Sequence, residues 1–290
     1  MGRKTEMILR IPDSVKEEML NYRGRVEAFL RGEISPVSFR AYRVPMGVYE
    51  QRMAGKYMVR IRVGAGLALP SQLERIAQLA KRYGNDILHV TTRQDIQIHD
   101  VDIEDTPDVM EGLLEAGLSP RGGGGNTVRN ITACPEAGVC SEEVFDVAPY
   151  AIAMAEYLLQ DKSSFNLPRK FKVVFSGCSK DCAFASVADL GFFAHLKDGV
   201  KGFAVFAGGG LGANPAVATR IEEFVEAKTA KQAGRRFLNY MLRRIEIGAA
   251  NGILAWHPDR LARNSIDGGK IIYLIDQGLL KDLSLIHISE

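Results

Sequence analysis

The segments RNITACPEAGVC, residues 129–140, and SGCSKDC, residues 176–182, contain all four cysteines of this 290-residue chain. Five residues separate Cys134 from Cys140, and three separate Cys178 from Cys182. Thiolates are soft ligands that suit iron–sulfur clusters or zinc, and a closed site uses four of them. The cysteine content therefore predicts one metal centre, with Cys134, Cys140, Cys178 and Cys182 as its ligands.

Other roles for these cysteines compete with the metal centre. Cysteine is often a small buried hydrophobic residue, and disulfides are rare in a reducing cytoplasm. Zinc sites usually show tighter C-x2-C pairs. The SGCSKDC segment could lie on a loop that enters a helix, where amide groups would stabilise anionic sulfur. The spacing favours a metal over a packing role and an iron–sulfur cluster over zinc, and it leaves zinc open.

The composition is that of an ordinary globular protein. Hydrophobic residues make up 46% of the chain, and the formal net charge is +2, so a core can form and the chain is not a polycation built for nucleic acid. No run approaches the roughly 20 apolar residues of a membrane helix, and no cleavable leader is visible. We therefore expect a cytoplasmic protein that binds neither nucleic acid nor membrane. Residues 283–290 are predicted to be a non-native tail, which would make the chain a fragment.

Hydrophobic periodicity predicts two mixed blocks of helices and strands. In the first block we expect helices over residues 12–32, 71–83 and 106–116, and strands over 57–63 and 86–100. In the second we expect a helix over 148–159, strands over 172–175, 189–194 and 202–206, and helices over 215–227 and 231–248. The run Gly122–Gly125 between the blocks lacks the ending of a phosphate loop and predicts a flexible linker. The resulting fold class is α+β.

Six short motifs follow one another along the chain: YMVRIRVGAG (57–66), TTRQDIQIH (91–99), RNITACPEAGVC (129–140), LPRKFK (167–172), SGCSKDC (176–182) and AGGGLG (207–212). In this ordered set the chain resembles the siroheme-containing nitrite and sulfite reductases, over about residues 57–212. The resemblance implies a ferredoxin-like half domain followed by a siroheme/4Fe–4S α/β domain. The implied divisions are an N-terminal helical extension (1–40), the half domain (41–120), the siroheme/4Fe–4S domain (121–282) and the tail (283–290).

The resemblance also implies roles for individual residues. All four cysteines match the cluster ligands of the family, and Cys182 would bridge the cluster to the siroheme iron. Siroheme carries many carboxylates and the substrate is an anion, so both require cations. The implied catalytic residues are Arg62, Arg129, Lys170 and Lys172. The implied cofactor-binding residues are Arg93, Gln94, Asn130, Gly208, Gly209, Gly210 and Cys182.

Several of these residues also have a simpler interpretation as structural or surface residues. Arg60 and Arg62 share one face of a strand and could simply be solvated, an interpretation that has more weight for Arg60 than for Arg62. His99 is expected to pack rather than to act as an acid. Lys170 and Lys172 would point to the same side of a strand, as would be needed for a shared target. In many family members the lysine and cysteine motifs lie in different pseudo-symmetric halves, whereas here they lie in one. A version built on one half and a site shared between chains both remain open.

The implied function is the six-electron reduction of sulfite to sulfide by an oxidoreductase with a siroheme coupled to a 4Fe–4S cluster. Lys172 favours sulfite, because sulfite carries the larger charge near neutral pH and some nitrite-type members have Asn at this position. The alternatives are nitrite reduction to ammonia at the same centre, a non-catalytic iron–sulfur electron-transfer module, and a zinc-stabilised binding domain. No nucleotide-binding fingerprint is seen, so we expect a ferredoxin or a reductase subunit as electron donor. Activity is expected of the complete enzyme rather than of this fragment alone.

Overall fold

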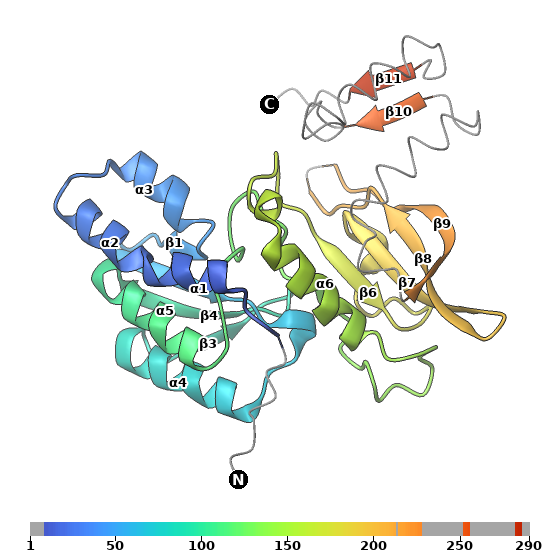
Figure 1. Ribbon diagram of the computed structural model, residues 1–290, viewed down its shortest axis with the longest axis horizontal. Coiled ribbons are helices and arrows are strands. Elements are labelled where there is room, and N and C mark those ends of the chain that lie inside the picture. Colours follow the sequence, from blue (N-terminus) through green and yellow to red (C-terminus); the bar gives the residue numbers. More distant parts are fainter. Residues whose placement is uncertain (1–8, 213, 228–251, 256–281, 286–290) are drawn as a thin grey trace. The chain divides into compact units, whose positions relative to one another are not determined.

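The computed structural model describes residues 9–212, 214–227, 252–255 and 282–285 (Figure 1). The chain divides into two compact units, Met1–Ala230 and Lys231–Glu290. In the second unit, the described residues form β10 (Gly252–Ala255) and β11 (Asp282–Leu285), which pair in parallel. The helix expected over residues 231–248 and most of the expected tail lie outside the described residues. All of the predicted site residues belong to the first unit.

The first half of this unit is an antiparallel sheet with helices beside it. The strand order is β1-β2-β4-β3, and the strands are β1 (Val48–Glu50), β2 (Lys56–Ile61), β3 (Leu88–Val90) and β4 (Ile96–Asp102). Val59 pairs with Ile98 and Ile61 with Ile96, and all four side chains are buried in one core. The alternation of apolar and polar residues in the sequence therefore gives β2 one side that faces the core, as expected for the predicted strand. The two strands within residues 86–100 are confirmed.

Five helices belong to this half, and Figure 1 shows most of them gathered beside the sheet. They are α1 (Asp13–Leu20), α2 (Tyr22–Leu30), α3 (Pro36–Arg43), α4 (Pro70–Tyr83) and α5 (Thr106–Glu115). Proline occupies the first turn of α3, α4 and α5, where no backbone donor is lost. The helices predicted from periodicity over 71–83 and 106–116 are confirmed.

The single helix expected over residues 12–32 is two helices that meet at Asn21. A ψ of −11° at Asn21 interrupts the regular helix geometry. Both α1 and α2 contact α5, but α1 also contacts α6 and α2 also contacts α3, so each helix packs against one further helix of its own. Val15, Met19, Tyr22 and Val26 keep the predicted helical spacing and are buried in the core of the first sheet. Packing against separate neighbours therefore bends the chain without changing which face is buried.

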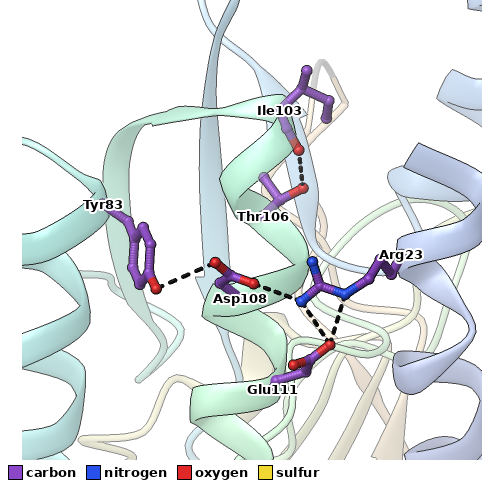
Figure 2. Close-up of polar contacts among 6 residues, drawn as sticks. All are labelled: Arg23, Tyr83, Ile103, Thr106, Asp108 and Glu111. Carbon is purple, nitrogen blue, oxygen red and sulfur yellow. Dashed lines mark hydrogen bonds and ion pairs between the residues drawn. The ribbon is translucent and has the colours of Figure 1, made fainter. Parts of the chain in front are cut away.

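A polar network on the outside of this half joins three helices (Figure 2). Arg23 of α2 donates to Asp108 at 2.5 Å and to Glu111 at 2.8 Å, both on α5. The hydroxyl of Tyr83, at the end of α4, donates to the other oxygen of Asp108 at 3.3 Å. The hydrogen bond from Arg23 lowers the pKa of Asp108. The network therefore ties α2 and α4 to α5 through one carboxylate.

The second half is a mixed sheet with the order β5-β6-β7-β8-β9. Its strands are β5 (Thr132–Ala133), β6 (Val173–Ser176), β7 (Leu190–Lys197), β8 (Val200–Ala207) and β9 (Thr219–Glu226), and its helix is α6 (Ala148–Gln160). β5, β6 and β7 run parallel, and β7, β8 and β9 are antiparallel. Phe175 stacks on Phe192 at 4.5 Å between ring centroids, and Phe203 meets both rings edge-on. These aromatic residues form the centre of the second sheet.

The expected elements of the second half are confirmed with one exception. The helix over 148–159 and the three strands appear where the sequence pattern placed them. The helix expected over 215–227 is wrong, because residues 219–226 form β9, which pairs with β8. Without β9, the outer edge of β8 would leave its backbone groups unpaired, and this pairing outweighs the local helical pattern. Both halves together confirm the expected α+β class.

Among the described residues, no helix combines the length and apolar character that crossing a bilayer requires.

The Arg23 network generates a stability prediction. Asp108→Asn should lower the free energy of unfolding by about 0.5–1 kcal/mol at neutral pH, since both partners are partly exposed and screened. The folded pKa of Asp108 is depressed, so its contribution is present above the unfolded pKa and is lost as the pH falls through the folded pKa. Urea unfolding at neutral pH and at about pH 3 measures this difference. Glu104→Gln, which removes an exposed acid, is the control, and an equal loss in both variants would contradict the assignment.

Candidate functional site

The two cysteine-bearing loops leave the same edge of the second sheet. β5 and β6 are parallel neighbours, with Ala133 opposite Phe175. Cys134 directly follows β5, and Cys178 follows β6 after one glycine. Because the carboxyl ends of neighbouring parallel strands point the same way, this pairing brings together two cysteine segments that are remote in the sequence.

Contacts between the two loops hold them to each other. The backbone N–H of Val144 donates to the carbonyl of Gly177 at 2.8 Å. Lys180 Nζ lies 2.7 Å from the carboxylate of Glu142. One contact is a backbone hydrogen bond and the other an exposed ion pair, so the first is the stronger constraint. The chain itself therefore sets the relative positions of the two loops.

The four thiols are free and differ in their exposure. Cys134 and Cys178 are buried, Cys140 is partly exposed and Cys182 is exposed. Burial raises the pKa of the Cys134 thiol, and the nearby Cys182 and Cys178 raise it further, while backbone hydrogen bonds to the thiol lower it. The thiols of Cys134, Cys178 and Cys182 therefore interact across the two loops.

This set of thiols fits an iron–sulfur cluster. Among the described residues, no three His, Cys, Asp or Glu side chains converge closely enough to hold a single metal ion. A 4Fe–4S cluster is a larger group that four thiolates bind, one to each iron, so its ligands need not meet at one point. Backbone hydrogen bonds of the kind that reach Cys134 also stabilise charge on cluster sulfur.

The arginines near the loops donate to backbone carbonyls. Arg62 is buried and donates to the carbonyls of Arg121 and Arg129, at 3.2 Å in each case. Arg60, which is half-buried, and Arg129 both donate to the carbonyl of Gly123 at 3.0 Å. Neither Arg60 nor Arg62 is a solvated strand residue. The structure thus brings both predicted catalytic arginines, Arg62 and Arg129, together around one loop.

That loop is the run Gly122–Gly125, and its prediction as a flexible linker is wrong. The first three glycines are buried, and the Thr127 hydroxyl lies 3.0 and 2.9 Å from the carbonyls of Gly122 and Gly124. A Cβ on Gly124 would lie 2.6 Å from the Tyr49 hydroxyl and closer still to a backbone carbonyl. The loop is glycine-rich because other backbone segments approach it too closely for side chains.

Gln94 joins the first sheet to the strand that leads into Cys134. Its backbone has a φ of 57°, in the left-handed region. Its side chain donates to the carbonyl of Ala133 at 2.8 Å and accepts from the N–H of the same residue at 3.2 Å. A single side chain thus satisfies both backbone groups of the residue before Cys134. The predicted cofactor residue Gln94 has a positioning role in this structure.

Arg93 and Asn130, also predicted to bind the cofactor, lie against each other. Arg93 donates to the carbonyls of Asn130 and Val173, at 2.9 and 2.8 Å. The amide of Asn130 donates to the carbonyl of Val63 at 2.7 Å and to that of Arg93 at 3.1 Å. These bonds connect the first sheet, the loop before β5 and the start of β6.

Three buried polar atoms at this junction have no hydrogen-bond partner in the described part of the chain: Arg93 Nε, Asp95 Oδ1 and Asn130 Oδ1. Burial lowers the pKa of Arg93 to about 10 and raises that of Asp95 to about 6. Buried polar groups are normally satisfied, so such atoms indicate a missing bound partner. Of the three atoms only Arg93 Nε is a donor, and this donor in a cationic junction fits a group that carries carboxylates, as siroheme does.

Lys172 lies beside these arginines, and Lys170 is exposed. Burial lowers the pKa of Lys172, and the positive charges of Arg93, Lys170 and Arg129 lower it further. The backbone N–H of Lys172 donates to Asp189 at 2.8 Å. The structure therefore brings Lys172 into electrostatic contact with Arg93 and Arg129, and Lys170 into contact with Lys172.

Gly208–Gly210 follow β8 at the same side of the sheet as the start of β7. Gly208 has a φ of 86° and donates to the carbonyl of Asp189 at 3.1 Å. A Cβ on Gly209 would lie 2.7 Å from the carbonyl of Ala188, whereas Gly208 and Gly210 have open space around them. Gly209 is thus required by packing, and the other two leave backbone accessible to a ligand.

Two residues of this region were missed by sequence reasoning. Asp95 lies inside the quoted motif TTRQDIQIH, where an acid next to Arg93 and Gln94 was the available signal. Tyr49 lies outside every motif; its hydroxyl accepts from the Gly125 N–H at 3.0 Å, and its ring lies under Arg60 at 5.2 Å. No local pattern marks Tyr49, because its partners come from distant segments. His99, expected to pack, contacts Gln51 at 3.3 Å.

Comparison with known families matches two domain models to this chain. Residues 49–116 match the nitrite/sulfite reductase ferredoxin-like half domain. Residues 124–243 match the nitrite and sulphite reductase 4Fe–4S domain. The two matches have the order and approximate limits of the two halves of the structure, and together they cover more than half of the chain.

Curated relatives and a solved structure agree with these matches. The chain is 37% identical over 196 residues to an assimilatory ferredoxin-dependent nitrite reductase of Haloferax mediterranei, covering 62% of this chain and 33% of the relative. It is 37% identical over 160 residues to a ferredoxin–nitrite reductase of Synechococcus elongatus, covering 53% and 31%. The structure of Mycobacterium tuberculosis NirA matches 97% of this chain and 55% of the NirA chain. The TM-score is 0.66 at 19% sequence identity, which supports the fold. The chain spans about a third of the length of these curated relatives.

The packed glycine loop generates a second prediction. Gly124→Ala should lower the free energy of unfolding by about 1–3 kcal/mol, because the added Cβ would overlap neighbouring atoms. Gly24→Ala in α2, where no atom lies within 4 Å of an added Cβ, should instead stabilise the chain by about 0.5–1 kcal/mol. Urea unfolding of the two variants measures both effects. If Gly124→Ala unfolded like the wild type, the loop would be the flexible linker that the sequence pattern indicated.

Proposed function

Since the chain belongs to the nitrite and sulphite reductase family, we propose that it forms the part of a reductase that holds a 4Fe–4S cluster and binds siroheme beside it. The complete enzyme would reduce nitrite to ammonia. The observation that carries this proposal is the pairing of β5 with β6, which places two cysteine loops next to a buried group of arginines. A cluster and an anion-binding centre thus share one edge of the second sheet.

The cluster ligands in this proposal are Cys134, Cys140, Cys178 and Cys182. Cys134 and Cys178 are buried on the loops that the Val144–Gly177 hydrogen bond connects. Cys182 is exposed, which suits a thiolate that contacts a second cofactor at the protein surface. We propose that Cys182 is the ligand shared with siroheme.

Siroheme, when bound, would supply an iron that accepts the substrate and electrons from the cluster. Arg93 would hold one of its carboxylates through Nε, a donor that has no partner in the described chain, and Asn130 would keep Arg93 in position through its bond to the Arg93 carbonyl. Gln94 would keep Ala133, and hence Cys134, in position. Gly208–Gly210 would let backbone approach the macrocycle closely.

Arg62, Arg129, Lys170 and Lys172 would attract and orient the anion. Each oxygen of nitrite must leave as water, so protons have to be delivered as electrons arrive. Lys172 suits this task, because burial and neighbouring cations lower its pKa and make its ammonium a better proton donor than a free lysine. Arg62 and Arg129 would stay charged, since their guanidinium groups are held by backbone carbonyls.

We infer nitrite rather than sulfite as the substrate, although the sequence prediction based on Lys172 was sulfite. The matched relatives named above are nitrite reductases, and a single lysine is weaker support than similarity over a long stretch of sequence. Their names also support a ferredoxin as electron donor.

Purified complete enzyme should show the proposed groups directly. Anaerobic preparation should give about four irons per chain in the cluster and about one more in siroheme. It should also give intense visible absorption bands, and reduced ferredoxin should drive conversion of nitrite to ammonia. A cluster without siroheme bands would indicate an electron-transfer module, and stoichiometric zinc without iron would overturn the proposal.

Lys172 offers a test of the substrate assignment. In the complete enzyme, Lys172→Asn should lower sulfite turnover much more than nitrite turnover, because the removed charge attracts the more highly charged anion more strongly. Initial rates with each anion at several concentrations measure the effect. Lys197→Asn, which removes an exposed lysine of β7, should leave both rates unchanged. Equal losses on both anions would exclude a charge-selective role for Lys172.

A further inference from the structure

A buried carboxyl group lies among the arginines of the site without pairing to them. The Asp95 side chain is 3% exposed, and its Oδ1 has no hydrogen-bond partner in the described part of the chain. Arg62 donates to the carbonyl of Arg129 and Arg93 Nη2 to that of Asn130, while Arg93 Nε forms no hydrogen bond in the described part of the chain. A buried acid that forms no close pair lowers stability, so the position is not explained by folding.

Four arginines act on Asp95 through space. Arg60 comes from β2 and Arg62 directly follows it, Arg93 comes from the same turn as Asp95, and Arg129 comes from the loop before β5. Arginine remains protonated across the ordinary pH range. Asp95 is therefore the residue whose protonation can change the net charge of this group of side chains.

We propose that Asp95 is a specificity-determining residue that makes the site favour a singly charged anion over a doubly charged one. This inference rests on the proposed function, and it explains how a site with two lysines could prefer nitrite. The cations attract any bound anion, and Asp95 repels it. Both effects scale with the charge of the anion, so Asp95 opposes a dianion about twice as strongly as a monoanion.

Lys172 and Asp95 act with opposite signs on the same choice. Lys172 adds a positive charge next to Arg93 and Arg129, and Asp95 places a negative charge near the same two arginines. Asp189 also lies nearby, and its carboxylate accepts the backbone N–H of Lys172 at 2.8 Å. Asp189 is thus engaged in holding the chain, whereas Asp95 is free to act by its charge.

The first experiment compares kcat/KM for sulfite and nitrite in the complete enzyme at about pH 8, where sulfite is largely a dianion and Asp95 is ionised. Asp95→Asn should raise the ratio of sulfite to nitrite by roughly fivefold to thirtyfold. Asp95→Glu keeps the negative charge and should stay near the wild-type ratio. Glu104→Gln removes an exposed negative charge and should also stay near that ratio. The double variant Asp95→Asn/Lys172→Asn should return toward the wild-type ratio.

The second experiment needs no turnover, and its main measurement uses the wild-type enzyme. Nitrite stays singly charged between about pH 7.5 and pH 5, while Asp95 takes up a proton as the pH falls through about 6. Loss of its charge removes repulsion, so the dissociation constant of nitrite, followed by absorption titration, should fall as the solution is acidified. In Asp95→Asn this change should be absent.

The outcomes separate this inference from the proposed function. An active enzyme whose selectivity is unchanged in Asp95→Asn, or nitrite binding that does not respond to pH in the wild type, would overturn the role of Asp95 alone. Absence of nitrite turnover in the wild-type holoenzyme would instead overturn the proposed function.

Discussion

The parallel pairing of β5 with β6, held in place by Gln94, is the constraint on which the site depends. β5 is two residues long, too short to be stable by its own ladder. The Gln94 side chain adds two hydrogen bonds to Ala133 from outside the sheet, and Arg93 binds the carbonyls on either side of the β5–β6 junction. The turn of the first sheet therefore completes the second sheet at the point where Cys134 begins its loop.

This arrangement makes the two halves of the unit interdependent. The predicted cofactor residues Arg93, Gln94 and Asn130 connect the turn before β4, the loop before β5 and the start of β6 by side-chain bonds to backbone. Arg62 and Arg129 do the same around the glycine loop. A guanidinium held by neutral carbonyls keeps its positive charge, and the nearby Asp95 opposes that charge only through space. The same bonds that stabilise the fold thus produce a strong local positive potential.

Asp95 departs from the rule that buried acids are paired. Its burial opposes ionisation more than the surrounding arginines favour it, which raises its pKa to about 6, so its charge can change near neutral pH. Groups that lower the folding stability in this way are common at functional sites.

The sequence by itself determined the cysteine pairs, the basic motifs and most elements, because these depend on spacing along the chain. Helices α4, α5 and α6 and strands β2, β6, β7 and β8 follow from hydrophobic periodicity and proline placement. Only the tertiary structure decided that Gly122–Gly125 is a packed loop, that residues 219–226 form β9 rather than a helix, and which carbonyls the arginines bind. Each of these depends on atoms from segments remote in sequence: a neighbouring carbonyl that excludes a Cβ, or an open strand edge. Local patterns carry no record of such contacts, so Tyr49 became visible only in the folded chain. For Asp95 the sequence offered its place in the motif TTRQDIQIH, but not its burial among the arginines.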